Sequence, residues 1–295
     1  MENETMYKTL TGTTLILLFA LASPLVSPAA AVTNGQPDDS LHPYVGLVVF
    51  YLGINPENNL PIPMWRCSGA LLSDTVFLTA AHCVSDPTPD LAQIWFNPAP
   101  PGQTPGQPID PSKYPYGGYD AKGTVLVAMP GYRTDNPKSG GLPGFDYHDV
   151  AVVIIDTWVT PYIGPYPELP EEDVVATLAM KTEVAIVGYG VREKAQISGP
   201  PYYRWFGRIR YYAPAQLIQS NDVISAEYLK LTANPGQGKG GTCFGDSGGP
   251  VLYGGTILGV NSFVTNANCA GVTYSNRIDT AAALYFINNP VPPPP

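Results

Sequence analysis

The chain has 295 residues, of which only 13% are charged, and its formal net charge is −9. This charge provides no basic surface for nucleic acid, and the length suffices for one or two compact units with a large core. The 33 prolines, 30 glycines and 44% hydrophobic residues favour a loop-rich all-β architecture over a helical bundle or a disordered chain.

The N-terminus carries the pattern of an export signal. An apolar run over 10–26 is followed by small residues that end at Ala31, as signal peptidase requires. Pro24 and Pro28 leave fewer than the ~18 consecutive apolar residues that a membrane span needs. We therefore predict a signal peptide over 1–31 and a secreted mature chain, extracellular or periplasmic, that does not bind membranes once the signal is removed.

Short runs of β-forming residues, separated by turn-rich segments, continue along the chain. The predicted strands are 45–52, 76–80, 124–129, 150–155, 183–187, 223–231, 251–253 and 256–263. Two segments dense in Pro and Gly, 86–119 (apart from 91–96) and 131–144, are expected to be long surface insertions. One helix is predicted over 280–287 with Asp279 as its N-cap, followed by an extended proline-rich tail over 289–295.

The cysteine count bears on the redox environment. An even number of cysteines in an exported chain favours disulfides over metal binding. The four cysteines have no zinc-like spacing, and there are only three histidines. No metal ion and no cofactor is therefore expected.

The clearest chemical signal is the sequence Gly-Asp-Ser-Gly-Gly-Pro at 245–250. A serine hydroxyl is a weak nucleophile, so it needs a base and hydrogen-bond donors for the developing oxyanion. The glycines let the backbone bend so that the amides of Gly245 and Ser247 point into one pocket. Taken alone, the motif could also be a simple hairpin loop.

The same letters match the Gly-x-Ser-x-Gly elbow of α/β-hydrolases. That elbow needs a helix after the serine and a histidine later in the chain. Here the strand-like run 250–253 follows Ser247. All three histidines precede the serine: His42, His82 and His148. Chain order therefore excludes the elbow.

A base and an orienting carboxylate must come from earlier in the chain. His82 follows the strand 76–80 and precedes Cys83, so a disulfide would hold it firmly, as a general base requires. By itself it could equally be a structural histidine. Asp149 opens the apolar strand 150–155, where a buried carboxylate needs a partner. We therefore predict that Asp149 orients the imidazole of His82.

The neighbouring candidates are weaker. Asp146 and Asp156 flank the same apolar run and are expected to be solvated. His42 precedes a proline in a polar stretch, and His148 directly precedes Asp149. Both are expected to be surface or loop histidines.

Three segments in this order, 79–83, 149–153 and 245–250, resemble the chymotrypsin/trypsin family of serine proteases. The resemblance covers roughly 32–287 and extends to Gly188-Tyr189-Gly190, which is similar to a Gly-aromatic-Gly turn of the family. It implies two antiparallel six-stranded β-barrels with the site between them and a C-terminal helix. The protease domain would span 32–288, with the boundary between the barrels near 160–180.

The resemblance also implies two disulfides, Cys67–Cys83 and Cys243–Cys269. The first would hold the base, and the second would hold the pocket beside the nucleophile. Each closes a short loop, which stabilises the fold by about 3 kcal/mol in the chain-entropy picture.

Family members mature by exposing an apolar N-terminus that pairs with the aspartate before the serine, here Asp246. The segment 32–35 resembles such a start, although Thr33 and Asn34 differ from the usual residues. The predicted signal cut falls directly before Val32. Our hypothesis is that signal peptidase itself creates the activating amino group.

By resemblance, the substrate pocket is formed by Gly241, Thr242, Phe244, Ser262, Phe263 and Val264. Enzymes that cut after Arg or Lys carry an aspartate where this chain has Gly241, so that specificity is not expected. Val264 would narrow the pocket wall. We therefore predict a preference for small or medium aliphatic residues before the cut, with leucine or an aromatic residue as the alternative.

Together, these features predict a secreted serine endopeptidase that acts on protein or peptide substrates through His82, Asp149 and Ser247. It is expected to be a monomer. The alternative is a catalytically inactive homologue that acts as a secreted binding module. A missing triad residue would mark such a homologue, and here all three are present.

Overall fold

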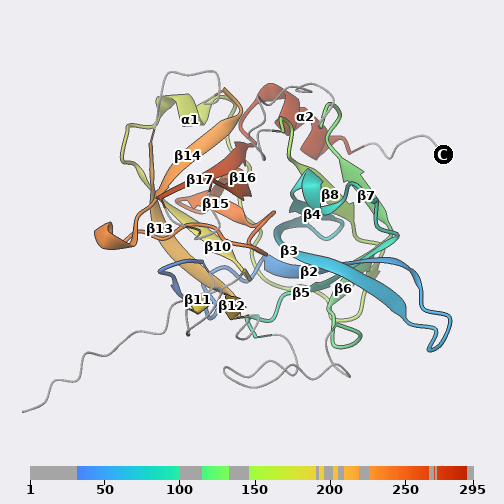
Figure 1. Ribbon diagram of the computed structural model, residues 1–295. Helices are drawn as coiled ribbons and strands as arrows, with labels where there is room; N and C mark the ends of the chain where they lie inside the picture. The colour runs from blue at the N-terminus through green and yellow to red at the C-terminus, as the bar shows by residue number, and fades with distance from the viewer. Residues whose placement is uncertain are drawn as a thin grey trace, which may run out of the picture.

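The computed structural model describes residues 32–99, 115–132, 146–190, 193–195, 202–204, 209–218, 226–265, 269 and 271–290. The predicted signal peptide and most of the proline-rich tail lie outside these residues, as does most of the predicted insertion 131–144. Figure 1 shows two β-sheets side by side, with a helix near the C-terminus. The predicted all-β class is confirmed.

The first sheet contains eight antiparallel strands in the order β7-β8-β4-β3-β2-β5-β6-β9. It curls around a core that includes Phe50, Leu71 and Trp95, all fully buried. Its strands are β2 (Val45–Ile54), β3 (Pro61–Ser73), β4 (Val76–Thr79), β5 (Leu91–Trp95), β6 (Ala121–Gly123), β7 (Val125–Ala128), β8 (Ala151–Ile154) and β9 (Thr157–Trp158).

The second sheet has the order β1-β13-β10-β15-β16-β17-β14, and β14 pairs again with β13. This last pairing closes six of the strands into a barrel, to which β1 is added outside. The strands are β1 (Gln36–Pro37), β10 (Glu183–Gly188), β13 (Tyr211–Leu217), β14 (Tyr228–Ala233), β15 (Pro250–Tyr253), β16 (Thr256–Val264) and β17 (Gly271–Arg277). A separate ribbon pairs β11 (Glu193–Ala195) with β12 (Tyr202–Arg204).

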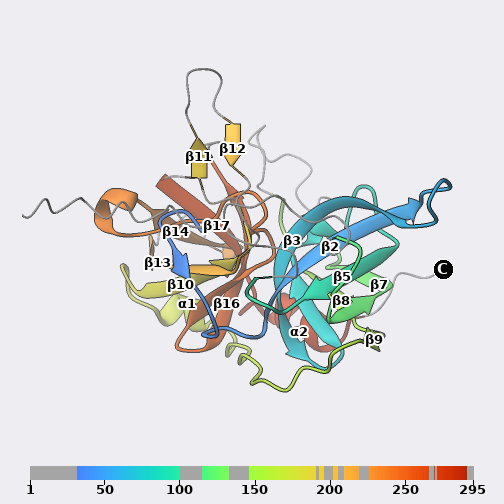
Figure 2. The ribbon, with the colours of Figure 1, turned by 90° about the horizontal axis from the view of Figure 1, so that it is seen from below.

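The chymotrypsin-like double barrel is therefore present, with one difference from the prediction of two six-stranded barrels. The C-terminal barrel is closed, whereas the N-terminal sheet is a curled half-barrel. Its end strands β7 and β9 are not paired with each other among the described residues. Figure 2 shows the two halves next to each other, with β3 and β2 facing the C-terminal barrel.

Several observed strands were not among those predicted, including β3, β13 and β17, and one predicted strand begins later than expected. β3 was not expected, because Pro61 and Pro63 lower strand propensity; the pairing of β2 with β3 accommodates them with register shifts near Tyr51. β5 corresponds to the run 91–96, which was excepted from the predicted insertion 86–119, and it pairs with β2. The expected strand 223–231 overlaps β14, which begins at Tyr228.

A buried ion pair joins the N-terminal segment to the two sheets. Asp38 and Arg210 are 0% and 1% exposed, and the guanidinium also donates to the carbonyls of Val45 (3.0 Å) and Phe96 (2.9 Å). The ring of His42 bonds to the same carboxylate. His42 lies in a loop, as predicted, and its side chain is 19% exposed. Burial by itself raises the pKa of Asp38, but His42 and Arg210 together hold it below its ordinary value.

The C-terminal helix α2 (Ala281–Asn288) begins one residue later than predicted, and its N-cap is Thr280. The Thr280 hydroxyl accepts the amide of Ala283 at 3.2 Å. The prediction that Asp279 caps this helix was wrong. The Asp279 carboxylate is buried and accepts hydrogen bonds from the guanidinium of Arg277 at 2.8 Å.

Helix α2 connects the two halves. It follows β17 of the C-terminal barrel, yet Ala283, Phe286 and Ile287 pack in the core of the N-terminal sheet. A short helix, α1 (Val174–Thr177), lies on the connection between the halves. Within the described part of the chain, no helix combines the length and apolarity needed to cross a membrane.

Candidate active site

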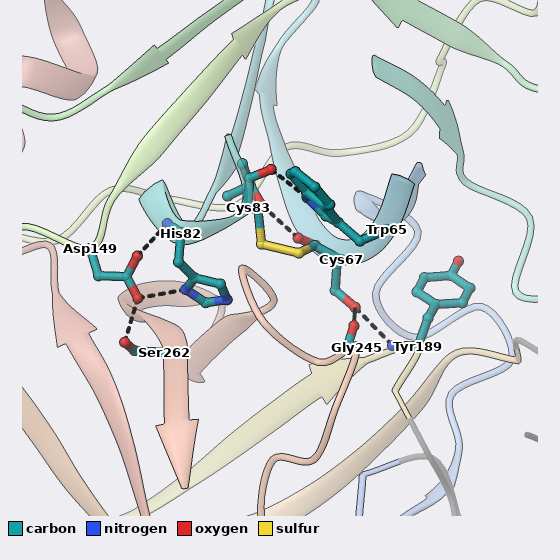
Figure 3. The surroundings of a disulfide bond; sticks show 10 residues. Trp65, Cys67, His82, Cys83, Asp149, Tyr189, Gly245 and Ser262 are labelled. Carbon is teal, nitrogen blue, oxygen red and sulfur yellow. Dashed lines mark hydrogen bonds and ion pairs between the residues drawn. A yellow bond between two sulfur atoms is a disulfide. The ribbon is translucent and has the colours of Figure 1, made fainter. Parts of the chain in front are cut away.

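The predicted base lies in a rigid turn. His82 occupies a short 3₁₀ turn (Ala81–Cys83) that directly follows β4. Cys83 is disulfide-bonded to Cys67 of β3, and the indole N–H of Trp65 donates to the Cys83 carbonyl at 2.8 Å. Figure 3 shows this disulfide beside the imidazole. The backbone of the base is therefore fixed to the neighbouring strand.

Asp149 stands just before β8 and holds His82 at two points. Its Oδ2 lies 2.8 Å from Nδ1 of the ring, and its Oδ1 accepts the backbone amide of His82 at 2.8 Å. The hydroxyl of Ser262 on β16 donates to the same Oδ2 (Figure 3). The carboxylate thus sets both the orientation and the tautomer of the imidazole.

The electrostatics favour an ionised Asp149. Its side chain is almost fully buried, and burial by itself raises the pKa of a carboxyl. The ring and amide of His82 and the hydroxyl of Ser262 outweigh this effect and hold the pKa of Asp149 below its ordinary value. The carboxylate is therefore negative when the imidazole accepts a proton.

The two neighbouring aspartates, Asp146 and Asp156, make other contacts. Asp156 is exposed at the far end of β8, where it accepts hydrogen bonds from the amide and hydroxyl of Thr124. The carbonyl of Asp146 accepts the hydroxyl of Tyr228 at 2.5 Å. Of the three aspartates around this strand, Asp149 bonds to the base.

Ser247 lies in the loop before β15, and both Ser247 and His82 line a cavity of about 420 Å³. The loop bends sharply at Gly245 (φ +96°) and Gly248 (φ +82°), backbone conformations that favour glycine. The carbonyl of Ser247 accepts the amide of Ser68 at 2.8 Å. Strand β3 therefore anchors the Ser247 loop to the half of the molecule that carries His82.

The predicted oxyanion donors are in this loop. Among the hydrogen bonds of the described residues, none uses the amide of Gly245 or of Ser247. Two unused amides beside a nucleophile can stabilise the negative oxygen of a tetrahedral intermediate.

Asp246 is fully buried beneath the loop. Its Oδ1 accepts the amide of Gly190 at 2.7 Å, and its Oδ2 accepts the amide of Cys243 at 2.9 Å. A Cβ on Gly188 would lie 2.3 Å from Oδ1, and one on Gly190 would lie 2.5 Å from the carboxyl carbon. The two glycines around Tyr189 therefore leave the space that this carboxyl occupies.

The pKa of Asp246 is raised to about 7 because burial outweighs the two amides and the positive charge of Arg66. Val32 is also fully buried, and the next residue, Thr33, donates its amide to the Gly241 carbonyl at 2.9 Å. This contact places the N-terminal segment beside the stretch that leads to Cys243 and Asp246.

Five of the six predicted pocket residues line the 420 Å³ cavity. The described residues on its wall are His82, Thr242, Cys243, Phe244, Ser247, Asn261, Ser262, Phe263, Val264 and Thr265. Asn261 and Thr265 were not predicted. Cys243 is disulfide-bonded to Cys269, so His82 is the only ionisable side chain among these described residues.

Gly241 lies outside the described lining. A Cβ there would lie 2.2 Å from the Cβ of Ala233 and 2.8 Å from the hydroxyl of Thr273, so no side chain fits without a shift. The hydroxyl of Thr273 also accepts the amide of Thr242 at 3.2 Å. The side chains of Ala233 and Thr273 therefore occupy the space that a side chain at position 241 would need.

Aromatic stacking holds one wall of the cavity. The ring of Phe263 stacks on Tyr274 with centroids 4.8 Å apart and an interplanar angle of 4°. The ring of Tyr228 meets Phe263 edge-on at 5.5 Å. Phe263 is therefore kept in place beside Val264.

A second cavity, of about 260 Å³, adjoins Ser247 and His82. The described residues that line it are Trp65, Arg66, Cys67, His82, Ser85, Asp86 and Ser247. It contains one cationic and one anionic side chain, neither of which was predicted. No sequence motif around Arg66 or Asp86 indicates that these side chains line a cavity. Arg66 reaches the cavity because β3 pairs with β2.

One group of described residues, Cys67, His82 and Cys83, is close enough to share a metal ion. Its two sulfurs are bonded to each other, so they do not offer thiolate ligands.

The two halves, with His82 and Asp149 from one and Ser247 and Ser262 from the other, define a chymotrypsin-like double barrel. The family model for Trypsin matches residues 50–285, and the chain belongs to the trypsin family. Both disulfides implied by the family resemblance, Cys67–Cys83 and Cys243–Cys269, are confirmed.

Solved structures support the fold. A human heparin binding protein is 16% identical over 88% of this chain and 99% of its own, with a TM-score of 0.57. A structure titled HL collagenase is 18% identical over 90% of this chain and 99% of its own, also with a TM-score of 0.57. No curated protein matches the sequence. At these identities the structural likeness shows the fold.

Proposed function

We propose that the chain is a secreted serine endopeptidase. The observation that carries the proposal is the bond from Asp149 to Nδ1 of His82 at 2.8 Å, with Ser247 on the same cavity as the ring. Trypsin-family membership and the two disulfides, which are typical of oxidising compartments, support it. The substrates would be proteins or peptides, and the enzyme would act as a monomer without a cofactor.

In this mechanism Ser247 Oγ attacks the scissile carbonyl carbon while Nε2 of His82 takes the hydroxyl proton. Asp149 stabilises the imidazolium, and the amides of Gly245 and Ser247 bind the oxyanion. The imidazolium then protonates the leaving amine as the peptide bond breaks. Water attacks the acyl-enzyme with His82 again as the base, which restores the serine.

A fluorophosphonate probe tests the proposal directly. Such a probe reacts with a serine only when a neighbouring base activates it. We expect mass spectrometry of the labelled mature chain to place the adduct on Ser247, with no label after heat denaturation. A folded chain that remains unlabelled and hydrolyses no peptide would contradict the proposal.

The alternative is a secreted binding module. One solved structure of similar fold is named for binding heparin. A net charge of −9 and a pI near 4.7 disfavour binding to a polyanion such as heparin. A chain that binds a partner and hydrolyses nothing would favour this alternative.

For specificity, we propose small or medium aliphatic residues before the cut. Val264 lines the cavity, where its branched side chain would narrow it, and apart from His82 the described wall carries no charge. Replacing Val264 with glycine is expected to raise kcat/KM for phenylalanine relative to alanine by about 10–100-fold, because pocket volume discriminates on this scale. Peptide substrates ending in Ala, Val, Leu, Phe and Arg measure the profile.

The matched control is Val159→Gly, since Val159 is 60% exposed and outside both cavities. Its profile should equal that of the unchanged enzyme. Fast cleavage after Arg would overturn the proposed specificity.

For activation, we propose that signal cleavage before Val32 creates an amino group that pairs with Asp246. In a chain extended before Val32, the pKa of Asp246 near 7 lies above its ordinary 3.8. Such a folded chain keeps a proton that the unfolded chain has lost, so its stability is expected to fall by a few kcal/mol as pH rises from about 4 to 7. In the mature chain, the free amino group of Val32 should stabilise the Asp246 carboxylate and so remove this loss of stability between pH 4 and 7.

Urea denaturation of the mature and extended chains at several pH values measures the effect. The extended Asp246→Asn variant is the control, and its stability should lack this pH dependence. N-terminal sequencing of the secreted enzyme should begin at Val32. A different start, or equal pH dependence in both chains, would contradict the proposed activation.

A further inference from the structure

A buried hydroxyl on β3 touches the oxyanion loop. Ser68 is 0% exposed, and its Oγ donates to the carbonyl of Gly245 at 2.9 Å. The same Oγ accepts the amide of Tyr189 at 2.9 Å. Figure 3 labels Gly245 and Tyr189, the two hydrogen-bond partners of this hydroxyl. One side chain therefore connects the loop to a second segment.

The backbone of Ser68 holds the same loop at another point. Its amide donates to the carbonyl of Ser247 at 2.8 Å. The two residues whose amides are the proposed oxyanion donors are thus both bonded to Ser68 through their carbonyls. These bonds lie at the two ends of the tripeptide that contains Asp246.

Tyr189 provides a rigid end for this connection. It is fully buried, and its phenol oxygen lies 3.0 Å from the carbonyl of Asn97 and 3.3 Å from that of Val45. The guanidinium of Arg210 donates to the same oxygen at 3.3 Å. Because the ring is held from several sides, the amide of Tyr189 is a fixed donor for the Ser68 hydroxyl.

We propose that Ser68 is a positioning residue for the oxyanion pocket, an inference that rests on the proposed peptidase function. Gly245 has φ +96° and no side chain to restrict it, so its peptide planes need an external restraint. The Ser68 hydroxyl supplies that restraint. Oxyanion donors are effective because they are already oriented and need no reorganisation during the reaction.

Removing the hydroxyl leaves the buried amide of Tyr189 and the partly buried carbonyl of Gly245 without their shared partner. Such groups are costly to leave unpaired, so Gly245 and Tyr189 should move toward each other. The amide of Gly245 would then turn away from the position of the oxyanion, while Ser247 and His82 keep their own contacts.

The test is Ser68→Ala measured with a good peptide substrate. We expect kcat to fall by about 10–100-fold with KM within about threefold, less than the 10²–10³-fold loss of a complete oxyanion donor. Affinity for a peptide aldehyde, which forms a tetrahedral adduct with the nucleophile, should fall by the same factor. A role in stability alone would lower the melting temperature and leave both quantities unchanged, which would overturn the inference.

The matched control is Tyr51→Phe. The Tyr51 hydroxyl donates to the side-chain oxygen of Gln93 at 2.9 Å, and the residue is fully buried in the core of the N-terminal sheet, where it does not bond to Gly245. This variant should lose stability and keep kcat within about threefold. If Ser68→Ala does not fold, Ser68→Cys decides the question, because a thiol is nearly the same size but a weak donor.

The outcomes separate the two proposals. An unchanged chain that folds but neither hydrolyses peptides nor binds the aldehyde would contradict the peptidase function. An active unchanged chain with equally active Ser68→Ala and Ser68→Cys variants would contradict only the role of Ser68.

Discussion

Replacing Ser247 with alanine is expected to lower kcat by about a million-fold, the scale found when a triad nucleophile is removed. The oxygen that attacks the carbonyl is absent from the variant, so no acyl-enzyme can form. The loop should stay in place, because its anchors are the backbone carbonyl of Ser247 and the amide of Gly248. The residual rate would come from binding and from the oxyanion donors.

The measurement is turnover of a peptide substrate by the purified mature enzyme, with unfolding curves to show that the variant is folded. Ser73→Ala is the matched control, since the Ser73 hydroxyl lies at the exposed end of β3, near Thr75. That control should retain full activity. Undiminished turnover by Ser247→Ala would rule out Ser247 as the nucleophile.

Asp149→Asn is expected to lower kcat by about ten-thousand-fold, the size known for this substitution in a Ser-His-Asp triad. The asparagine amide would donate to Nδ1 of His82, where the carboxylate now accepts at 2.8 Å. The proton would then be on Nε2, and the ring could no longer accept a proton from Ser247. The variant would also lose the negative charge that stabilises the imidazolium.

Steady-state kinetics with the same peptide measure the loss, which should fall mainly on kcat. Asp156→Asn is the control, because Asp156 carries an equivalent carboxylate at the exposed end of the same strand. It should keep near-normal rates. A comparable loss in both variants would mean that the effect comes from strand β8 and not from the triad.

Much of the candidate site could be predicted from short sequence segments. The residues around Ser247, His82 and Asp149 form local patterns, because each function needs a particular residue type with particular neighbours. The two disulfides followed from the family resemblance, and both are present.

Other features could not be read from local patterns. Ser68 follows Cys67 in β3, a strand that was not predicted because Pro61 and Pro63 lower its strand propensity. No neighbouring residue indicates that the Ser68 hydroxyl bonds to the carbonyl of Gly245. Similarly, the sequence places Asp279 directly before a helix, where capping is the ordinary role. Only the folded chain brings the amide of Val175, 104 positions away, onto that carboxylate.

The sequence by itself determined which residues carry the proposed chemistry, through Ser247 and the order of His82 and Asp149 before it. It also determined the β class and the C-terminal helix. The tertiary structure decided which groups meet, including Ser262 with Asp149 over 113 positions of the chain and Ser68 with Gly245 over 177. The reason is that the alternation along a strand indicates its buried face, whereas long-range packing sets its partners and register.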